Sequence, residues 1–306
     1  MNRKTYPIDG WLILDKPLGL TSAQAVGKAR RITGCKKIGH AGTLDPLATG
    51  VLPLALGEGT KTIPFIMDAE KAYRFEVTWG EARSTDDAEG EVTATHHHRP
   101  SRKAIEAILE RFTGQVRQLP PIYSALKVAG QRAYALARKG ETPELAPRDV
   151  IIYSLVLEEL PDQDRAVFTV CCGKGTYVRA LARDLAVALG TVGYVSALRR
   201  LKVGKFSVEL AISLENLEKL VHNPTPDGRD GPGLGYLWPV ESALDDIPAF
   251  EADSGLATRL RSGQPLPGGT YPVKEGSLVL VKTDGRAVAL CRMGEGLIKP
   301  VRVFNL

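Results

Sequence analysis

The stretch from Gly39 to Gly50 reads Gly39-His40-Ala41-Gly42-Thr43-Leu44-Asp45-Pro46-Leu47-Ala48-Thr49-Gly50. Its three glycines and one proline predict a constrained loop, because glycine permits left-handed backbone and proline fixes one dihedral angle. The loop presents Asp45, the only acidic residue between Asp15 and Glu58. This carboxylate suits chemistry on an anionic polymer, but an aspartate that only caps the turn before Pro46 would give the same pattern.

A cluster of basic residues precedes the loop. Its members are Lys16, Lys28, Arg30, Arg31, Lys36 and Lys37. Cations gathered beside one acid favour contact with a nucleic-acid backbone, although a solvated helix surface also fits them. The whole chain of 306 residues carries a net charge of only +5, which permits a nucleic-acid partner without requiring one.

The composition indicates a soluble globular protein, with 43% hydrophobic and 25% charged residues. We expect neither a zinc site nor a disulfide framework, because the four cysteines (Cys35, Cys171, Cys172 and Cys291) form no CxxC pair. This usage fits a reducing cytoplasm. The start of the chain has no secretory signal, and no stretch approaches the roughly 20 apolar residues of a membrane span. We interpret His96-His97-His98 as surface, not metal ligands, since neighbouring residues on an extended chain face opposite sides.

Periodicity predicts two elements near the loop. A helix follows Thr21 and Ser22, either of which can cap it, and Gly34 can end it. Its predicted apolar positions are Ala23, Val26, Ala29 and Ile32. The residues from Tyr73 to Trp79 alternate and predict a half-buried strand with Tyr73, Phe75, Val77 and Trp79 on one face.

A second glycine-rich loop opens a predicted helix near Arg179. A cation in the first turn of a helix opposes the helix dipole, so Arg179 needs a local partner, and a carboxylate would supply one. A nearby guanidinium lowers the pKa of an aspartate and keeps it ionised. A plain surface arginine remains the alternative.

The Asp45 loop, with Val51-Leu52-Pro53 after it, resembles the signature loop of the TruB family of tRNA pseudouridine synthases. Similar motifs follow in order through residues 10–210. They are Asp15-Lys16-Pro17, Lys71-Ala72-Tyr73-Arg74, Pro120-Pro121-Ile122-Tyr123-Ser124-Ala125-Leu126-Lys127, and Gly175-Thr176-Tyr177-Val178-Arg179.

The resemblance implies roles for single residues. The implied catalytic residues are Asp45, Tyr73 and Arg179, where Tyr73 stacks on the base and helps to move a proton. The implied substrate-binding residues are His40, Tyr177, Lys16, Arg31 and Lys127. We expect Lys16 and Arg31 to contact the RNA backbone. The basic stretch from Leu198 to Phe206 also suggests phosphate contact.

The resemblance implies an α+β fold, with a mixed, mainly antiparallel sheet flanked by helices and a small C-terminal β-barrel similar to PUA domains. We predict a catalytic domain over residues 1–240 and an RNA-binding domain over 245–306. Prolines and glycines at 223–235 predict a flexible linker.

The implied activity is isomerisation of the T-loop uridine at tRNA position 55, acting on a flipped-out nucleotide and requiring neither cofactor nor metal. We expect a cytoplasmic monomer whose partner is the tRNA T-arm. Two alternatives are a non-catalytic RNA-binding or tRNA-folding protein and an aspartate-based hydrolase of a small molecule. Gly57-Glu58-Gly59-Thr60-Lys61 invites comparison with a nucleotide-binding loop, but lacks its Gly-Lys-Ser/Thr order.

Overall fold

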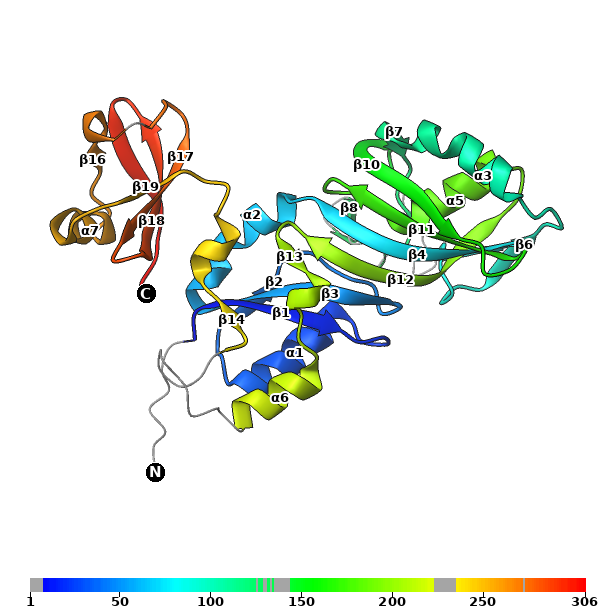
Figure 1. The fold of residues 1–306 in the computed structure, drawn as a ribbon, viewed down its shortest axis with the longest axis horizontal. Helices are drawn as coiled ribbons and strands as arrows, with labels where there is room; N and C mark the ends of the chain where they lie inside the picture. The colour runs from blue at the N-terminus through cyan, green and yellow to red at the C-terminus, as the bar shows by residue number, and fades with distance from the viewer. Residues whose placement is uncertain are drawn as a thin grey trace.

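The structure, a computed structural model, describes residues 8–124, 126–128, 131–132, 134, 144–222, 235–271 and 273–306. Ten strands form one large sheet in the order β14-β1-β3-β12-β4-β11-β10-β7, with β2 paired to β3 and β13 paired to β12 (Figure 1). Their bounds are β1 (Gly10–Lys16), β2 (Ile38–His40), β3 (Ala48–Leu56), β4 (Lys71–Trp79), β7 (Gly114–Gln118), β10 (Arg148–Glu159), β11 (Arg165–Cys172), β12 (Gly193–Val203), β13 (Phe206–Ser207) and β14 (Leu237–Trp238).

Short strands and helices surround this sheet. The two small strand pairs are β5 (Glu81–Arg83) with β6 (Val92–Thr95), and β8 (Lys127–Val128) with β9 (Gln131–Arg132). The helices are α1 (Ser22–Thr33), α2 (Ile63–Asp68), α3 (Arg102–Ile108), α5 (Val178–Ala188) and α6 (Leu214–His222). The 3₁₀ turns are η1 (Gly57–Thr62), η2 (Leu109–Phe112), η3 (Val208–Leu210) and η4 (Val240–Ala243).

Within the described strands, every neighbouring pair of the large sheet is antiparallel except β3 and β12. The parallel pair joins the two halves of the sheet: Leu198, Arg199 and Arg200 lie opposite Ala48, Thr49 and Gly50. Helices α1 and α6 lie beside the half that contains β1 and β3, and α5 lies beside the other half (Figure 1). The predicted mixed, mainly antiparallel sheet flanked by helices is therefore confirmed.

Local sequence explains the elements that frame the junction. The Thr21 side chain caps α1 in a capping box with Gln24, and Gly34 ends the helix at φ 70°, as predicted. The predicted apolar face is wrong at Ala23, which is exposed, whereas Ala25 is buried. The strand β4 buries Phe75, Val77 and Trp79 on one face, as its alternation predicts.

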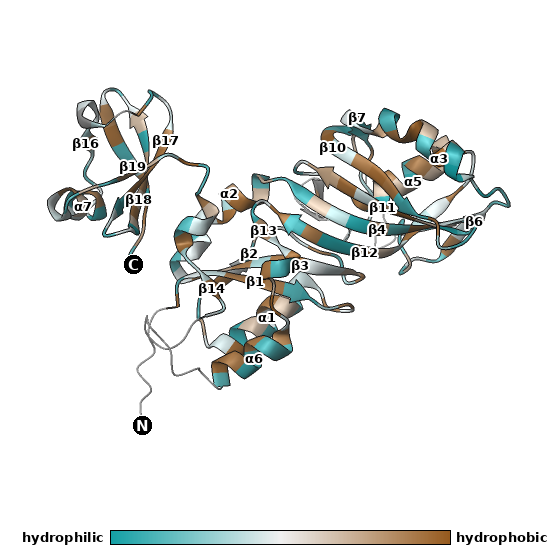
Figure 2. Cartoon of the chain, in the orientation of Figure 1, coloured by the Kyte–Doolittle hydropathy of each residue, from teal (hydrophilic) through white to brown (hydrophobic). Residues whose placement is uncertain are grey.

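The main hydrophobic core lies between the large sheet and its helices. Leu14 of β1, Leu52 of β3 and Phe75 of β4 pack with Ala29 of α1 and Leu181 of α5 in one cluster. Figure 2 shows this patterning, since hydrophobic and hydrophilic residues alternate along the strands. This shared core fixes α1 and α5 against the same sheet.

The C-terminal part forms its own curled sheet of five strands in the order β15-β17-β18-β19-β16, set apart from the large sheet (Figure 1). Its elements are β15 (Ala249–Glu251), α7 (Ser254–Arg261), β16 (Leu266–Pro267), η5 (Gly268–Thr270), β17 (Leu278–Thr283), β18 (Arg286–Gly294) and β19 (Leu297–Val303). A separate hydrophobic cluster, including Leu260, Val281 and Ile298, fills it. The predicted linker at 223–235 lies outside the described residues except for Gly235.

Among the described helices, none combines the length and the apolar character that crossing a membrane requires.

Candidate functional site

The Asp45 loop connects β2 to β3 and is held from three sides. Ser22, the first residue of α1, accepts a hydrogen bond from Leu44 N at 2.8 Å and donates one to Leu44 O at 3.0 Å. The backbone takes a left-handed conformation at Gly42 (φ 103°) and Gly50 (φ 96°), which explains the glycines. A Cβ at Gly50 would lie 2.2 Å from Arg200 O, so the loop can approach β12 only without a side chain there.

Two buried cations, Arg200 and Lys16, bind backbone carbonyl oxygens of the loop and of the segments next to it. The guanidinium of Arg200 donates to Val51 O at 2.7 Å and Gly42 O at 3.1 Å. The ammonium of Lys16, which is 0% exposed, donates to Leu20 O at 2.6 Å, Pro17 O at 3.0 Å and Pro46 O at 3.4 Å. Burial lowers the pKa of Lys16 to about 8, and the charge of Asp45 opposes this effect.

The burial of Lys16 corrects one prediction. A buried Lys16 cannot reach an RNA phosphate at the surface, because its ammonium is already bound to three carbonyl oxygens. In the basic stretch from Leu198 to Phe206, Arg200 is buried, whereas the other cations pair with acidic side chains and stay partly exposed. Arg199 binds Asp15 at 2.8 Å, Arg200 binds the loop, Lys202 pairs with Glu70 and Lys205 pairs with Asp245.

Arg179, in the first turn of α5, contacts the loop directly. Its Nε lies 3.0 Å from Asp45 Oδ2, and its Nη1 lies 3.5 Å from Asp87 Oδ2. The same guanidinium donates to Thr85 O at 2.9 Å and Tyr123 O at 2.8 Å. The predicted carboxylate partner of Arg179 is thus Asp45, reached from a different half of the sheet.

The predicted electrostatic balance at Asp45 is wrong in its net direction. Burial raises the pKa of Asp45 above its ordinary value, Arg179 opposes that rise, and the charge of Asp87 reinforces it. The desolvation of the carboxylate therefore outweighs its guanidinium partner. The side chain is still 37% exposed, so a substrate can reach it.

The predicted ring residues Tyr73, Tyr177 and His40 lie on β4, just before α5 and on β2. Tyr73, on β4 opposite Arg200, is half-buried, and burial raises the pKa of its hydroxyl. Tyr177 precedes α5; its N–H donates to Gln118 Oε1 at 2.8 Å and its carbonyl accepts from Gln118 Nε2 at 3.1 Å. Arg148 lies 5.0 Å above the Tyr177 ring. His40 ends β2 and is half-buried.

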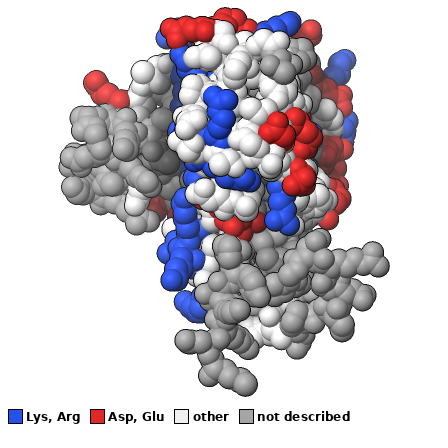
Figure 3. Space-filling model, turned by 90° about the vertical axis from the view of Figure 1, so that its left-hand side faces the viewer, with Lys and Arg blue, Asp and Glu red and all other residues white. Residues whose placement is uncertain are grey.

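The two remaining predicted residues lie farther out. Arg31 is exposed in the last turn of α1. Lys127 begins β8, but its side chain lies outside what the structure describes. Figure 3 shows Lys and Arg side chains along the lower left edge of this face, whereas basic and acidic side chains are intermixed over the rest of it.

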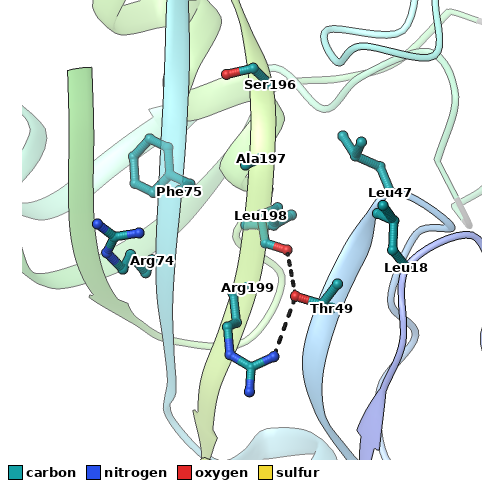
Figure 4. A pocket seen from close by; sticks show the side chains of 9 residues that line it. All are labelled: Leu18, Leu47, Thr49, Arg74, Phe75, Ser196, Ala197, Leu198 and Arg199. Atoms are coloured by element: carbon teal, nitrogen blue, oxygen red, sulfur yellow. Dashed lines mark hydrogen bonds between the residues drawn. The ribbon is translucent and has the colours of Figure 1, made fainter. Parts of the chain in front are cut away.

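A cavity of about 280 Å³ opens where β3 and β12 separate (Figure 4). Leu18 and Leu47 line one side, and Phe75 and Arg74 lie beyond β12 on the other. Thr49 bridges the strands by donating to Leu198 O at 3.5 Å. Leu47, one of the lining residues, stands two positions after Asp45 in the chain, and the lining is mainly apolar.

The glycine-rich stretch at 57–61 and the three histidines at 96–98 have structural or surface positions. The stretch from Gly57 to Lys61 belongs to η1; Lys61 donates to Val303 O at 2.6 Å, and Glu58 accepts from Asn305 N at 2.8 Å, so it holds the end of the C-terminal sheet. The histidines at 96–98 are exposed. No group of three potential metal ligands occurs within the described ranges.

Sequence reasoning missed Asp87, Gln118 and the structural use of Arg200. Asp87 is 2% exposed although it lies in a stretch rich in acidic residues after Ser84. The spacing of Arg179 and Arg183, four residues apart on one helix face, was the signal that could have directed attention to acidic partners.

Comparisons with known proteins agree along the whole chain. The family description "TruB family pseudouridylate synthase (N terminal domain)" matches residues 30–178, and "tRNA pseudouridylate synthase B C-terminal domain" matches residues 179–245. The tRNA pseudouridine synthase B of Bradyrhizobium diazoefficiens is 53% identical, over 100% of this chain and 88% of its own length. The protein of the same name from Rhodospirillum rubrum is 48% identical over 99% of both chains.

Solved structures share the fold. A chain in the crystal structure of a Cbf5-Nop10-Gar1 complex matches with a TM-score of 0.73 and 27% identity, over 96% of this chain and 84% of that one. A chain in an H/ACA RNP structure matches with a TM-score of 0.74 over 100% of this chain and 92% of that one. At 23% identity, this second likeness concerns the fold alone.

Proposed function

The chain belongs to the TruB family and isomerises uridine to pseudouridine in tRNA, and on that premise we propose that its target is the uridine at position 55 of the T-loop, with Asp45 as the nucleophile. The observation that supports this assignment is the Arg179–Asp45 contact of 3.0 Å at the junction of the two sheet halves. A partly exposed carboxylate that a guanidinium orients suits nucleophilic attack.

The reaction needs one bond broken and one formed. The bond from uracil N1 to ribose C1′ breaks, the base turns, and a bond from C5 to C1′ forms while a proton leaves C5 and N1 gains one. Asp45 acts at the junction of sugar and base. The target base leaves its stack to reach this carboxylate, at a cost of a few kcal/mol that contacts with RNA offset.

The other side chains act around this step. Arg179 orients Asp45 and opposes the effect of burial on its pKa. Tyr73 stacks on the base and helps to move a proton, and burial raises the pKa of its hydroxyl further above neutral pH. His40 and Tyr177 shape the pocket. Lys16 and Arg200 hold the loop in place from below.

RNA binding extends beyond the pocket. Arg31 on α1 contacts the backbone of the T-arm, as does Lys127. The catalytic part comprises residues 1–240, and residues 245–306 form the second RNA-binding domain; their separate hydrophobic clusters support this division. The protein acts as a monomer in the cytoplasm, where the free thiols of its four cysteines suit the reducing conditions.

The decisive experiment measures pseudouridine in an unmodified tRNA transcript with wild type, Asp45→Asn and Asp162→Asn. Asp162 is a matched control because it pairs with Arg165 in the turn between β10 and β11. We expect wild type and the control to modify only the T-loop uridine, and Asp45→Asn to be inactive at equal folded fraction. Activity in Asp45→Asn would refute the assigned nucleophile. Tight tRNA binding without product in all three proteins would favour the RNA-binding alternative.

A further inference from the structure

Arg183 lies one turn after Arg179 on the same face of α5 and makes three polar contacts. Its Nη1 lies 3.0 Å from Asp86 Oδ2, and its Nε lies 2.9 Å from Asp184 Oδ1. Its Nη2 donates to Leu119 O at 2.8 Å. None of these contacts involves Asp45, so the mechanism above does not use Arg183.

The contacts of Arg183 run parallel to those of Arg179. Both arginines bind the loop at 85–87, since Arg179 reaches Thr85 O and Asp87 while Arg183 reaches Asp86. Both also bind the segment at 119–123, through Tyr123 O and Leu119 O respectively. One face of α5 therefore fastens the same two segments twice.

Asp86 is a potential competitor for Arg179. Its carboxyl group is mostly buried, and burial raises its pKa, while Arg183 and then Arg179 oppose that rise. Its backbone has a positive φ of 59°, which is uncommon outside glycine and shows that the surroundings hold it there. A buried carboxylate that loses its cation seeks another one, since an unpaired buried charge is costly.

The other cation that acts on Asp86 is Arg179, which already contacts Asp45 and Asp87. The charged groups that act on this cluster from the surrounding elements are Lys16, Asp45, Asp86, Asp87, Glu89 and Asp184. Five of the six are acidic, so two arginines serve several carboxylates. If Arg183 is removed, we expect Arg179 to shift towards Asp86 and away from Asp45.

We propose that Arg183 is a positioning residue of this enzyme: by pairing with Asp86 and holding Leu119 O, it leaves Arg179 free to orient Asp45. This role rests on the proposed function, because it acts through the Arg179–Asp45 pair. Arg183 itself does not touch the substrate.

The test is a double-mutant cycle with Arg183→Met, Asp86→Asn and the combined variant, using pseudouridine formation in a tRNA transcript. We expect Arg183→Met to lower kcat about tenfold or more, as small displacements of reacting groups do, while KM for tRNA stays within about twofold. In the Asp86→Asn background, the same change should cost about threefold or less, because the competing carboxylate is gone.

The pH dependence of kcat separates positioning from a merely structural role. When Arg179 moves towards Asp86, its opposing effect on the pKa of Asp45 weakens, so that pKa rises further. The acidic limb of kcat should therefore move to higher pH in Arg183→Met and return in the combined variant. Arg183→Lys should recover part of the activity, since it restores the charge but not all three contacts.

The controls keep the inference separate from the proposed function. Arg165→Met removes a comparable arginine–aspartate pair far along the sheet and should leave kcat unchanged. Inactive wild type would contradict the proposed function. Active wild type with inactive Asp45→Asn, but equal losses from Arg183→Met in both Asp86 backgrounds, would overturn the positioning role alone. If Arg183→Met does not fold, Arg183→Lys measured both in the wild-type background and in the Asp86→Asn background gives the same decision.

Discussion

Replacing Lys16 with methionine tests how strongly the fold constrains its buried ammonium. Burial lowers the pKa of Lys16 from its ordinary value of 10.5 to about 8. Between these values the unfolded chain holds a proton that the folded chain has released, so the free energy of unfolding rises with pH. The difference corresponds to about 3.4 kcal/mol in total, at 1.36 kcal/mol per pKa unit. About 1.4 kcal/mol of this falls between pH 7 and pH 9.

The assay is urea unfolding of wild type, Lys16→Met and Lys219→Met at pH 7 and pH 9. Lys219 is a matched control because it is an exposed lysine paired with Glu215 on α6. The stability of wild type relative to Lys16→Met should grow by about 1.4 kcal/mol between the two pH values, whereas Lys219→Met should follow wild type. If the gap between wild type and Lys16→Met were the same at both pH values, the reasoning about the buried ammonium would be refuted.

Three further perturbations probe the site and the C-terminal sheet. Because burial raises the pKa of Asp45, its ionised form destabilises the fold increasingly as pH rises through that pKa. Asp45→Asn should therefore raise the melting temperature at pH 7. A melting temperature below that of wild type, measured by calorimetry, would contradict this. Gly50→Ala should lower the free energy of unfolding more than Gly19→Ala. Both glycines have positive φ, which costs about 1–2 kcal/mol for alanine, but only a Cβ at Gly50 would lie 2.2 Å from a backbone oxygen, that of Arg200. Equal losses of stability in urea unfolding would exclude the steric argument. Glu58→Ala should make the amide of Asn305 exchange with solvent about tenfold faster or more by NMR, and unchanged exchange would show that this contact does not hold the C-terminal sheet.

The sequence predicted best where the signal is local. Alternation from Tyr73 to Trp79 placed the buried face of β4 correctly, and capping residues located both ends of α1. The pattern of Ala23 and Val26 failed in part, because a three-residue spacing drifts from the helical period of 3.6. The argument from the helix dipole at Arg179 predicted a carboxylate partner, and Asp45 occupies that position.

Prediction failed where burial depends on distant segments. Lys16 and Arg200 are cations of the kind that bind phosphate at a surface, but both are buried and bound to backbone carbonyl oxygens. The net direction of the pKa of Asp45 was also missed, because desolvation reflects everything packed around the loop rather than one neighbouring guanidinium. Periodicity predicts which face of a helix or strand is apolar. It does not predict whether a cation that lies between two elements is buried.

The position of β12 has a consequence for synthesis on the ribosome. This strand supplies the only parallel pairing between the described strands of the large sheet, joining Leu198 to Ala48 and seating Arg200 under the loop. A nascent chain that ends before β12 therefore leaves one edge of β4 and the start of β3 without their β12 partner, and such edges attract other strands. The N-terminal half exposes these edges until β12 emerges, so the two halves of the sheet close, and the Asp45 loop gains its contacts with Arg200, only late in translation.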